Sequence, residues 1–265
     1  MIPKIIHYCW VGPASLDPKA CENIESWKKF FPDYEILEWN NSNIPLEIEY
    51  VNNAYKNKRW ANVSNYVRLY ALNKYGGIYF DTDVEVLKRF DFLNEDTKCF
   101  LGIESHDHKK IFLNNAILGA ERGFFFLKQC IDQLIVDFNG LENGNLSSPI
   151  LTTKEMSKLG KLKSIGGKIK GIDIFPKEYF YPLSWDKDSS SVDLSSSYAI
   201  HYGELSWFEN LEIPFLNIEN IKDEKKRHLI TRYHLYNVYV GNISLKQFLV
   251  IFKNFLRYKI GLALY

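Results

Sequence analysis

The sequence lacks several features that would each define a protein class. No run of eighteen apolar residues occurs, so no membrane-spanning helix is predicted. The four cysteines, Cys9, Cys21, Cys99 and Cys130, include no CxxC pair, which argues against a zinc knuckle or a disulfide framework and favours a reducing compartment. Neither GxGxxG nor GxxxxGK is present, and we find no internal repeat. With 265 residues, of which 46% are hydrophobic and 25% charged, the chain is long enough for one substantial domain.

Acidic residues are missing from one segment, residues 225–265. This segment carries eight basic residues, whereas the other 224 residues carry 25 basic and 32 acidic ones. Apolar residues recur there at helical spacing, at Leu245, Phe248, Leu249, Phe252, Phe255 and Leu256, which predicts a basic amphipathic helix. Two interpretations stay open: the helix lies on an anionic membrane, or it packs on the domain with a solvated basic face. Nucleic acid is the poorer partner because no recognition motif accompanies the charge.

The residues from Trp60 to Leu87 carry the strongest local pattern. Helical spacing of apolar residues predicts a helix over Ala61–Tyr75, which the Gly76-Gly77 pair ends by supplying positive φ angles. Ile78–Phe80 then forms a short apolar run that is typical of a buried strand. Asp81 and Asp83 follow at its carboxyl end, where two-residue spacing in extended chain turns both carboxylates to one side. This pattern predicts a site for a hard divalent cation at a sheet edge that commonly binds ligands.

This segment resembles the DxD-containing sugar transferases of glycosyltransferase family 32. That family is related to the yeast initiating mannosyltransferase and, more distantly, to the clostridial glucosylating toxins. The matching positions are Ala61, Ser64, Tyr66, Arg68, Leu72, Gly76, Gly77, Tyr79, Asp81 and Asp83. The resemblance implies an α/β fold of GT-A type: a Rossmann-like mixed sheet flanked by helices, forming a single catalytic domain over residues 1–224 with a helical tail over 225–265.

One position departs from the family pattern. Asn65 stands where the family carries an aspartate, which together with the arginine matching Arg68 is expected to hold hydroxyls of the donor sugar. Asparagine keeps a carbonyl acceptor but lacks the charge, so a charge-assisted hydrogen bond becomes an ordinary one. Donor choice, or activity itself, therefore depends on this residue.

Three further blocks extend the resemblance. In Ile2–Gly12, the tryptophan matching Trp10 is expected to stack on the nucleotide base beside Cys9, although a buried first strand would explain the block equally well. In Phe112–Gly123, Asn114 or Asn115 is expected to face the donor or acceptor, the alternative being an asparagine pair in a turn. In Tyr198–Trp207, His201 is expected as a metal ligand, with Ser206 and Trp207 capping the diphosphate; the alternative is a hydrogen-bonded core histidine.

Together these blocks imply a candidate site. Asp81, Asp83, Arg68 and Asn65 are the expected catalytic residues, and Asp83, Asp81 and His201 the expected ligands of Mn²⁺ or Mg²⁺, which suit an oxygen-rich site with one imidazole. The expected donor-binding residues are Cys9, Trp10, Ser64, Asn65, Arg68, Gly77, Tyr79, Asp81, Asn115, Ser206 and Trp207.

The expected reaction is retaining transfer of a hexose from a nucleoside-diphosphate sugar, with UDP favoured, to a glycan acceptor in bacterial capsule or lipopolysaccharide synthesis. The alternative is a catalytically degenerate protein of the same fold that binds sugar nucleotides or glycans. A haloacid-dehalogenase phosphatase also places DxD after a strand, but the GDxxxD cluster of that class is missing. Because the first expected strand begins at Ile2, we expect no signal peptide or anchor before it. We therefore expect a cytoplasmic protein, peripheral on the bacterial inner membrane if the tail binds lipid and the acceptor is lipid-linked.

Overall fold

The computed structural model describes residues 1–107, 110–142, 144, 146–183 and 192–203. The chain divides into two compact units, Met1–Pro182 with Asp193–Trp207, and Leu183–Val192 with Phe208–Tyr265. The first unit is described below. Ser206, Trp207, the expected boundary at residue 224 and the basic tail all lie outside the described residues.

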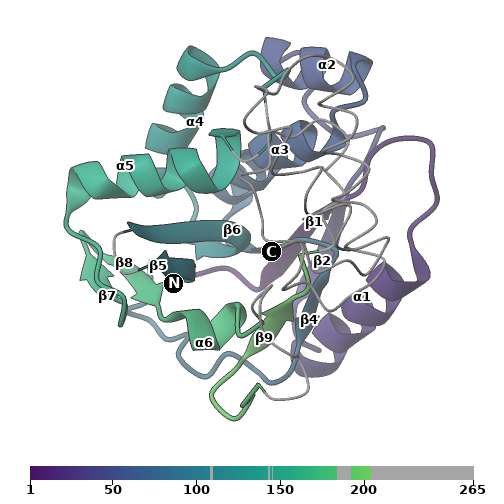
Figure 1. The fold of residues 1–265 in the computed structure, drawn as a ribbon. Helices are drawn as coiled ribbons and strands as arrows, with labels where there is room; N and C mark the ends of the chain where they lie inside the picture. The colour runs from purple at the N-terminus through teal and green to yellow at the C-terminus, as the bar shows by residue number, and fades with distance from the viewer. Residues whose placement is uncertain (108–109, 143, 145, 184–191, 204–265) are drawn as a thin grey trace, which may run out of the picture. The chain divides into compact units, whose positions relative to one another are not determined.

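A seven-stranded mixed sheet forms the centre of this unit, with strand order β2-β1-β3-β6-β5-β8-β7 (Figure 1). A second, two-stranded sheet pairs β4 with β9. The strands are β1 (Ile5–Cys9), β2 (Glu35–Trp39), β3 (Gly77–Phe80), β4 (Val84–Val86), β5 (Cys99–Asp107), β6 (Lys110–Ala120), β7 (Gly167–Ile169), β8 (Ile172–Phe175) and β9 (Ala199–His201). The helices are α1 (Pro18–Phe30), α2 (Glu49–Lys56), α3 (Trp60–Tyr75), α4 (Phe125–Asp137), η1 (Leu146–Ile150, a π-helix), α5 (Leu151–Leu159) and α6 (Lys177–Phe180). The predicted mixed α/β architecture is confirmed.

Strand directions define one functional edge of the sheet. β1 runs parallel to β2 and β3, and β8 runs parallel to β5. β6 lies antiparallel to both β3 and β5, so β3 and β5 run in the same direction. β8 shares that direction because it is parallel to β5. The carboxyl ends of β1, β3, β5 and β8 therefore meet at one edge, and we call this the carboxyl edge.

Two apolar cores lie on opposite faces of the sheet. Side chains of α2, α3, α4 and α5 contribute to the first core, and those of α1, α6 and β4 contribute to the second. Figure 1 shows the first group of helices on one side of the sheet. Alternation along β3 divides its side chains between them: Tyr79 belongs to the first core, Ile78 and Phe80 to the second. The strand that carries the aspartates is thus buried on both faces. Among the described residues, no helix combines the length and apolar character needed to cross a bilayer.

The helix, glycine pair and strand predicted around residue 76 are confirmed as α3 and β3. Gly76 and Gly77 have φ angles of +71° and +110°. A Cβ on Gly77 would lie 2.4 Å from the carbonyl oxygen of Ile5, because β3 pairs closely with β1 there. Gly77, expected at the donor site, therefore has a structural role at the amino end of β3.

A buried histidine links β1 to both neighbouring elements. His7 is fully buried, with Nε2 2.9 Å from the carbonyl oxygen of Gly76 and Nδ1 3.2 Å from the indole nitrogen of Trp39. Because the indole donates to Nδ1, the ring is neutral with its proton on Nε2. Burial lowers the pKa of His7 below 6.5, although the bond to Gly76 opposes that shift.

We expect this histidine to make the fold sensitive to acid. The unfolded chain binds a proton at His7 more readily than the folded chain, so the free energy of unfolding should fall as pH drops through the unfolded-state pKa of about 6.5. Thermal unfolding midpoints across this range measure the effect, with His7→Gln as the comparison. An equally steep loss in His7→Gln would assign the sensitivity to other groups.

Candidate active site

The two aspartates flank a tight turn between β3 and β4. The backbone N–H of Asp81 donates to the carbonyl of Ala116 at 2.8 Å, continuing the β3–β6 ladder, and the N–H of Val84 donates back to the carbonyl of Asp81 at 3.0 Å. The extended chain expected between the aspartates is therefore wrong, because Thr82 and Asp83 form a hydrogen-bonded turn. The turn nevertheless brings both carboxylates to the carboxyl edge.

Strand pairing brings His201 to the same place. β9 lies antiparallel to β4 with His201 opposite Val84, and the N–H of Tyr202 donates to the carbonyl of Asp83 at 3.0 Å. Nε2 of His201 lies 3.3 Å from Oδ1 of Asp83. His201 therefore lies beside the aspartates, and its role as a metal ligand stays a prediction.

The donor atoms of Asp81, Asp83 and His201 all lie within 4.8 Å of one another. Donor atoms bound at about 2.1 Å to one octahedral cation lie about 3 Å apart when adjacent and about 4.2 Å apart when opposite. Small side-chain adjustments would therefore allow all three to ligate one cation. Two carboxylates and one imidazole form a donor set suited to a divalent cation of the Mg²⁺ or Mn²⁺ type.

Electrostatics within the cluster favour a bound positive charge. Burial raises the pKa of Asp81, and the nearby Asp83 carboxylate adds to that rise, while Arg68 opposes it. Burial of His201 disfavours its protonation, yet the Asp83 and Asp81 carboxylates raise its pKa to about 9. A proton thus neutralises part of the negative charge here, and a metal cation would take its place.

Arg68 connects α3 to the first aspartate. The residue is 4% exposed, and its guanidinium lies over the ring of Tyr79, with Nη2 2.9 Å from Oδ1 of Asp81. The same Nη2 lies 3.3 Å from the hydroxyl of Ser64 one turn earlier. Ser64 and Tyr79, both expected at the donor site, therefore contact Arg68, which in turn binds the Asp81 carboxylate. A contact between Arg68 and a donor hydroxyl stays a prediction.

Asn65 faces the segment that precedes α5. Its side chain is 5% exposed, and its Nδ2 donates to the carbonyl of Gly144 at 2.8 Å and to the hydroxyl of Ser147 at 3.1 Å. An aspartate has no N–H with which to make these bonds. The departure from the family pattern therefore has a structural correlate: the asparagine binds a loop to α3.

A bulge in β6 carries the two expected asparagines. Pairing with β5 shifts from Leu101–Leu118 to Gly102–Asn114, so residues 115–117 of β6 have no partner in β5. Asn115 is 1% exposed and donates to Thr152 at 2.7 Å, while its Oδ1 is buried without a partner among the described residues. Asn114 bonds within the bulge, to the N–H of Ala116.

Trp10 and Cys9 lie at the carboxyl end of β1, at the same edge as the aspartates. The Trp10 indole donates to the carbonyl of Ala14 at 2.9 Å, and its ring packs partly against the second core. Burial raises the pKa of the Cys9 thiol, so it is protonated and unreactive at neutral pH. Stacking of Trp10 on a base stays a prediction.

Sequence reasoning missed the role of α1 in fixing the DxD turn. Asn23 donates to the carbonyl of Thr82 at 2.9 Å, and the Trp27 indole donates to the carbonyl of Val84 at 2.8 Å. The Ser26 hydroxyl accepts from the N–H of Val86 at 2.9 Å. The sequence offers one signal for this role: Asn23 and Ser26 are polar residues three apart on a helix face that is otherwise apolar, and buried polar groups need hydrogen-bond partners.

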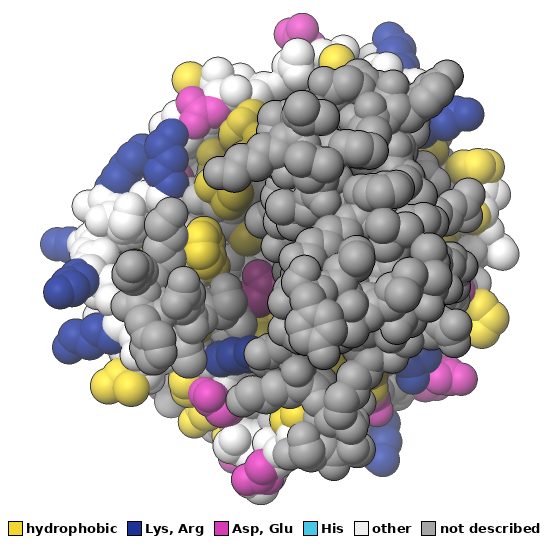
Figure 2. All heavy atoms as spheres, in the orientation of Figure 1, with side chains coloured by type: hydrophobic (Ala, Val, Ile, Leu, Met, Phe, Trp, Pro, Cys, Tyr) yellow, Lys and Arg dark blue, Asp and Glu magenta, His cyan; other side chains and the backbone are white. Residues whose placement is uncertain are grey.

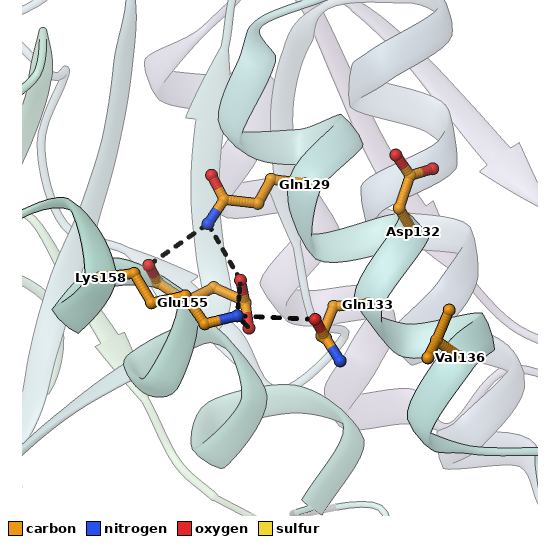
Figure 3. Close-up of a pocket in the computed structure, with 6 residues that line it drawn as sticks. All are labelled: Gln129, Asp132, Gln133, Val136, Glu155 and Lys158. Atoms are coloured by element: carbon orange, nitrogen blue, oxygen red, sulfur yellow. Dashed lines mark hydrogen bonds and ion pairs between the residues drawn. The ribbon is translucent and has the colours of Figure 1, made fainter.

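A hollow elsewhere in the unit is separate from this cluster. It has a volume of about 470 Å³ and lies between α4 and α5 (Figure 3). Glu155 is buried at its base, 2.6 Å from the Lys158 ammonium and 2.9 Å from the Gln129 amide. This fully bonded network links the two helices and includes none of the three residues of the metal cluster.

Comparison with known proteins identifies the aspartate segment. Residues 18–100 match the family described as glycosyltransferase sugar-binding region containing DXD motif. This segment of the chain is therefore similar to the DXD-containing sugar-binding region of glycosyltransferases. That region includes α1, α3 and β3, and so both the aspartates and the helix that fixes their turn.

Two curated relatives and one solved structure are also similar. Lactosylceramide 4-alpha-galactosyltransferase of Mus musculus is 32% identical over 151 residues, covering 52% of this chain and 40% of the relative. Alpha-1,4-N-acetylglucosaminyltransferase of Homo sapiens is 25% identical over 188 residues, covering 66% and 49%. The chain thus spans less than half the length of either relative. The PaToxG glycosyltransferase structure superposes with a TM-score of 0.51 at 20% identity, covering 59% of this chain and 69% of that one, which confirms a glycosyltransferase fold of GT-A type.

Proposed function

We propose that this chain is a metal-dependent retaining hexosyltransferase of glycosyltransferase family 32 that uses a nucleoside-diphosphate sugar, with UDP favoured as the nucleotide. The observation that carries the proposal is the convergence of Asp81, Asp83 and His201 at the carboxyl edge of a glycosyltransferase fold. The DXD-containing match over residues 18–100 supports it independently.

We assign a role to each of the described side chains at the proposed site. Asp83 and His201 would hold Mn²⁺ or Mg²⁺ directly, and Asp81, held by Arg68, would contact the cation or its water. A divalent cation bound there stabilises negative charge on the leaving nucleoside diphosphate as a Lewis acid. Trp10 would stack on the base. Asn115, whose buried Oδ1 has no partner within the described part of the chain, would accept a hydrogen bond from a sugar hydroxyl.

We propose a glycan attached to a lipid as the acceptor, in the assembly of a bacterial surface polysaccharide at the inner face of the cytoplasmic membrane. The galactosyltransferase relative is named for a glycolipid, lactosylceramide. The basic segment over residues 225–265, which lies outside the described residues, would add attraction to anionic lipid.

A screen of sugar nucleotides with Mn²⁺, measured by release of nucleotide, tests the proposal. Slow hydrolysis of one donor, abolished by a chelator, is the expected result. A complete lack of release with every donor, together with retained binding of a sugar nucleotide, would favour the degenerate binding protein instead.

Asn65→Asp should change the donor preference. The carboxylate would lose the donated bond to Gly144 and place charge beside the donor pocket, where the family pattern has an aspartate. We expect at least about a tenfold change in relative rates among donors, since one charged hydrogen bond is worth about 1.5 to 3 kcal/mol. The measurement is the same nucleotide-release screen.

Asn62→Asp is the matched control for this substitution. Asn62 lies one turn earlier on α3, is also buried, and donates to the carbonyls of Gly140 and Glu142 at 3.0 and 2.8 Å. Both variants should lower the unfolding midpoint, but Asn62→Asp should keep the donor ranking. If Asn65→Asp also keeps the donor ranking, Asn65 lies outside the sugar-binding site. If the parent is inactive and Asn65→Asp gains turnover, Asn65 is the cause of the parent's inactivity.

A further inference from the structure

A lysine-rich surface follows α5 and continues through β7. Six of the 17 residues from Lys154 to Lys170 are lysines, and the one acidic residue among them, Glu155, is buried and paired with Lys158. Figure 2 shows Lys and Arg side chains gathered on the side of the molecule where Figure 1 places α5 and β7. Ion pairs engage three of these lysines, Lys154 with Asp137, Lys158 with Glu155 and Lys168 with Asp173. Among the described residues, the positive charge without such a pair lies at Lys161, Lys163 and Lys170.

Two of these lysines precede an exposed apolar residue in the sequence. Lys161 and Lys163 are exposed and make no ion pair within the part of the chain that the structure describes. The N–H of Gly166 donates to the carbonyl of Lys163 at 3.0 Å and closes a turn with Ile165 near its tip. Ile165 is 80% exposed, so this turn displays a branched aliphatic side chain. In the sequence it follows Lys161 and Lys163 and precedes Lys168.

The backbone holds this turn in a fixed place. Gly166 has a φ angle of +79°, and a Cβ there would lie 2.3 Å from the carbonyl oxygen of Ile174. Gly167 then begins β7 opposite Ile174, near the carboxyl end of β8. Because β8 and β3 run in the same direction, the turn lies at the carboxyl edge, as do Asp81 and Asp83.

We propose that residues 161–170, the lysine turn, dock this protein on a bilayer that contains anionic lipid. Ile165 would enter the headgroup region while Lys161 and Lys163 contact lipid phosphates. A soluble polyanion would account for the lysines but would gain nothing from the exposed isoleucine. Docking at the carboxyl edge would bring the proposed cation site toward the membrane that holds the acceptor. This orientation rests on the proposed function, whereas lipid binding itself does not.

Vesicle flotation with the full-length chain tests the proposal. The probes are phosphatidylcholine vesicles with and without phosphatidylglycerol, and dextran sulfate as a soluble polyanion. Lys161→Gln with Lys163→Gln should weaken binding to the anionic vesicles by about fivefold per lysine, hence about 25-fold together. Ile165→Ser should weaken vesicle binding by about tenfold and leave dextran sulfate binding unchanged.

The control pair is Lys29→Gln with Lys74→Gln. These exposed lysines end α1 and α3, at the opposite edge of the sheet, and change the net charge equally. Retained binding in the control supports the proposal. Equal loss in the control pair, no vesicle binding by the parent, or an Ile165→Ser variant that binds like the parent would each overturn it. Donor hydrolysis without vesicles should be the same in all variants, so failure of the proposed reaction is recorded separately.

Discussion

Asp83→Asn is expected to lower metal-dependent nucleotide release by about a thousandfold, the largest effect on activity that the structure predicts. An amide oxygen is neutral and binds a hard cation weakly, while the side chain keeps its size. His201 would also lose the carboxylate that lies 3.3 Å from its Nε2. The reaction should therefore lose the cation and the orientation of a second ligand together.

Two measurements separate this loss from a folding defect. Mn²⁺ should raise the unfolding midpoint of the parent, because a ligand of the folded state stabilises it, and should not raise that of Asp83→Asn. Asp132→Asn is the control, since Asp132 pairs with Lys128 on the exposed face of α4 and should change neither quantity. Activity of Asp83→Asn within about tenfold of the parent would remove Asp83 from the cation site.

The central segment was predictable because its signals are local. The periodicity of α3, the positive φ of two glycines and the apolar run of β3 each depend on neighbouring residues, and the resulting elements, Trp60–Tyr75 and Gly77–Phe80, differ from the expected ones by a single residue. The turn between the aspartates was not predictable, since it depends on a hydrogen bond from Asn23, 59 residues earlier. Short motifs thus indicate chemistry more reliably than the backbone path that presents it.

His201 also shows that local sequence does not predict features set by distant residues. Nothing in the residues around it predicts a cation ligand, and the expectation came from the family resemblance alone. In the structure its place is set by antiparallel pairing with β4, more than a hundred residues away in sequence. The π-helix η1, with Pro149 inside it and Ser147 bonded to Asn65, was also unpredicted, because it depends on contacts to α3.

Arg68→Met is expected to cause the largest loss of stability among single substitutions at the site. Arg68 is 4% exposed and is the cationic partner of the Asp81 carboxylate, whose side chain is 24% exposed. Removing it leaves a largely buried carboxylate without that partner, which typically costs about 3 kcal/mol. Urea unfolding measures the free energy of unfolding directly. Nucleotide release should also fall, because the Asp81 carboxylate loses its fixed orientation.

The double variant Arg68→Met with Asp81→Asn distinguishes charge burial from lost packing. It removes both charges, so it should recover most of the stability while staying inactive.

In the single variant the pKa of Asp81 should rise further, and a protonated carboxyl is easier to bury. The loss of stability should therefore be smaller at mildly acidic than at neutral pH, with no such difference in the double variant. Arg89→Met, which breaks an exposed pair with Asp33, should leave the free energy of unfolding nearly unchanged. If the double variant is as unstable as the single one, Arg68 stabilises the fold through its stacking on Tyr79 and its bonds to Ser64, and the charge of Asp81 is not the cause.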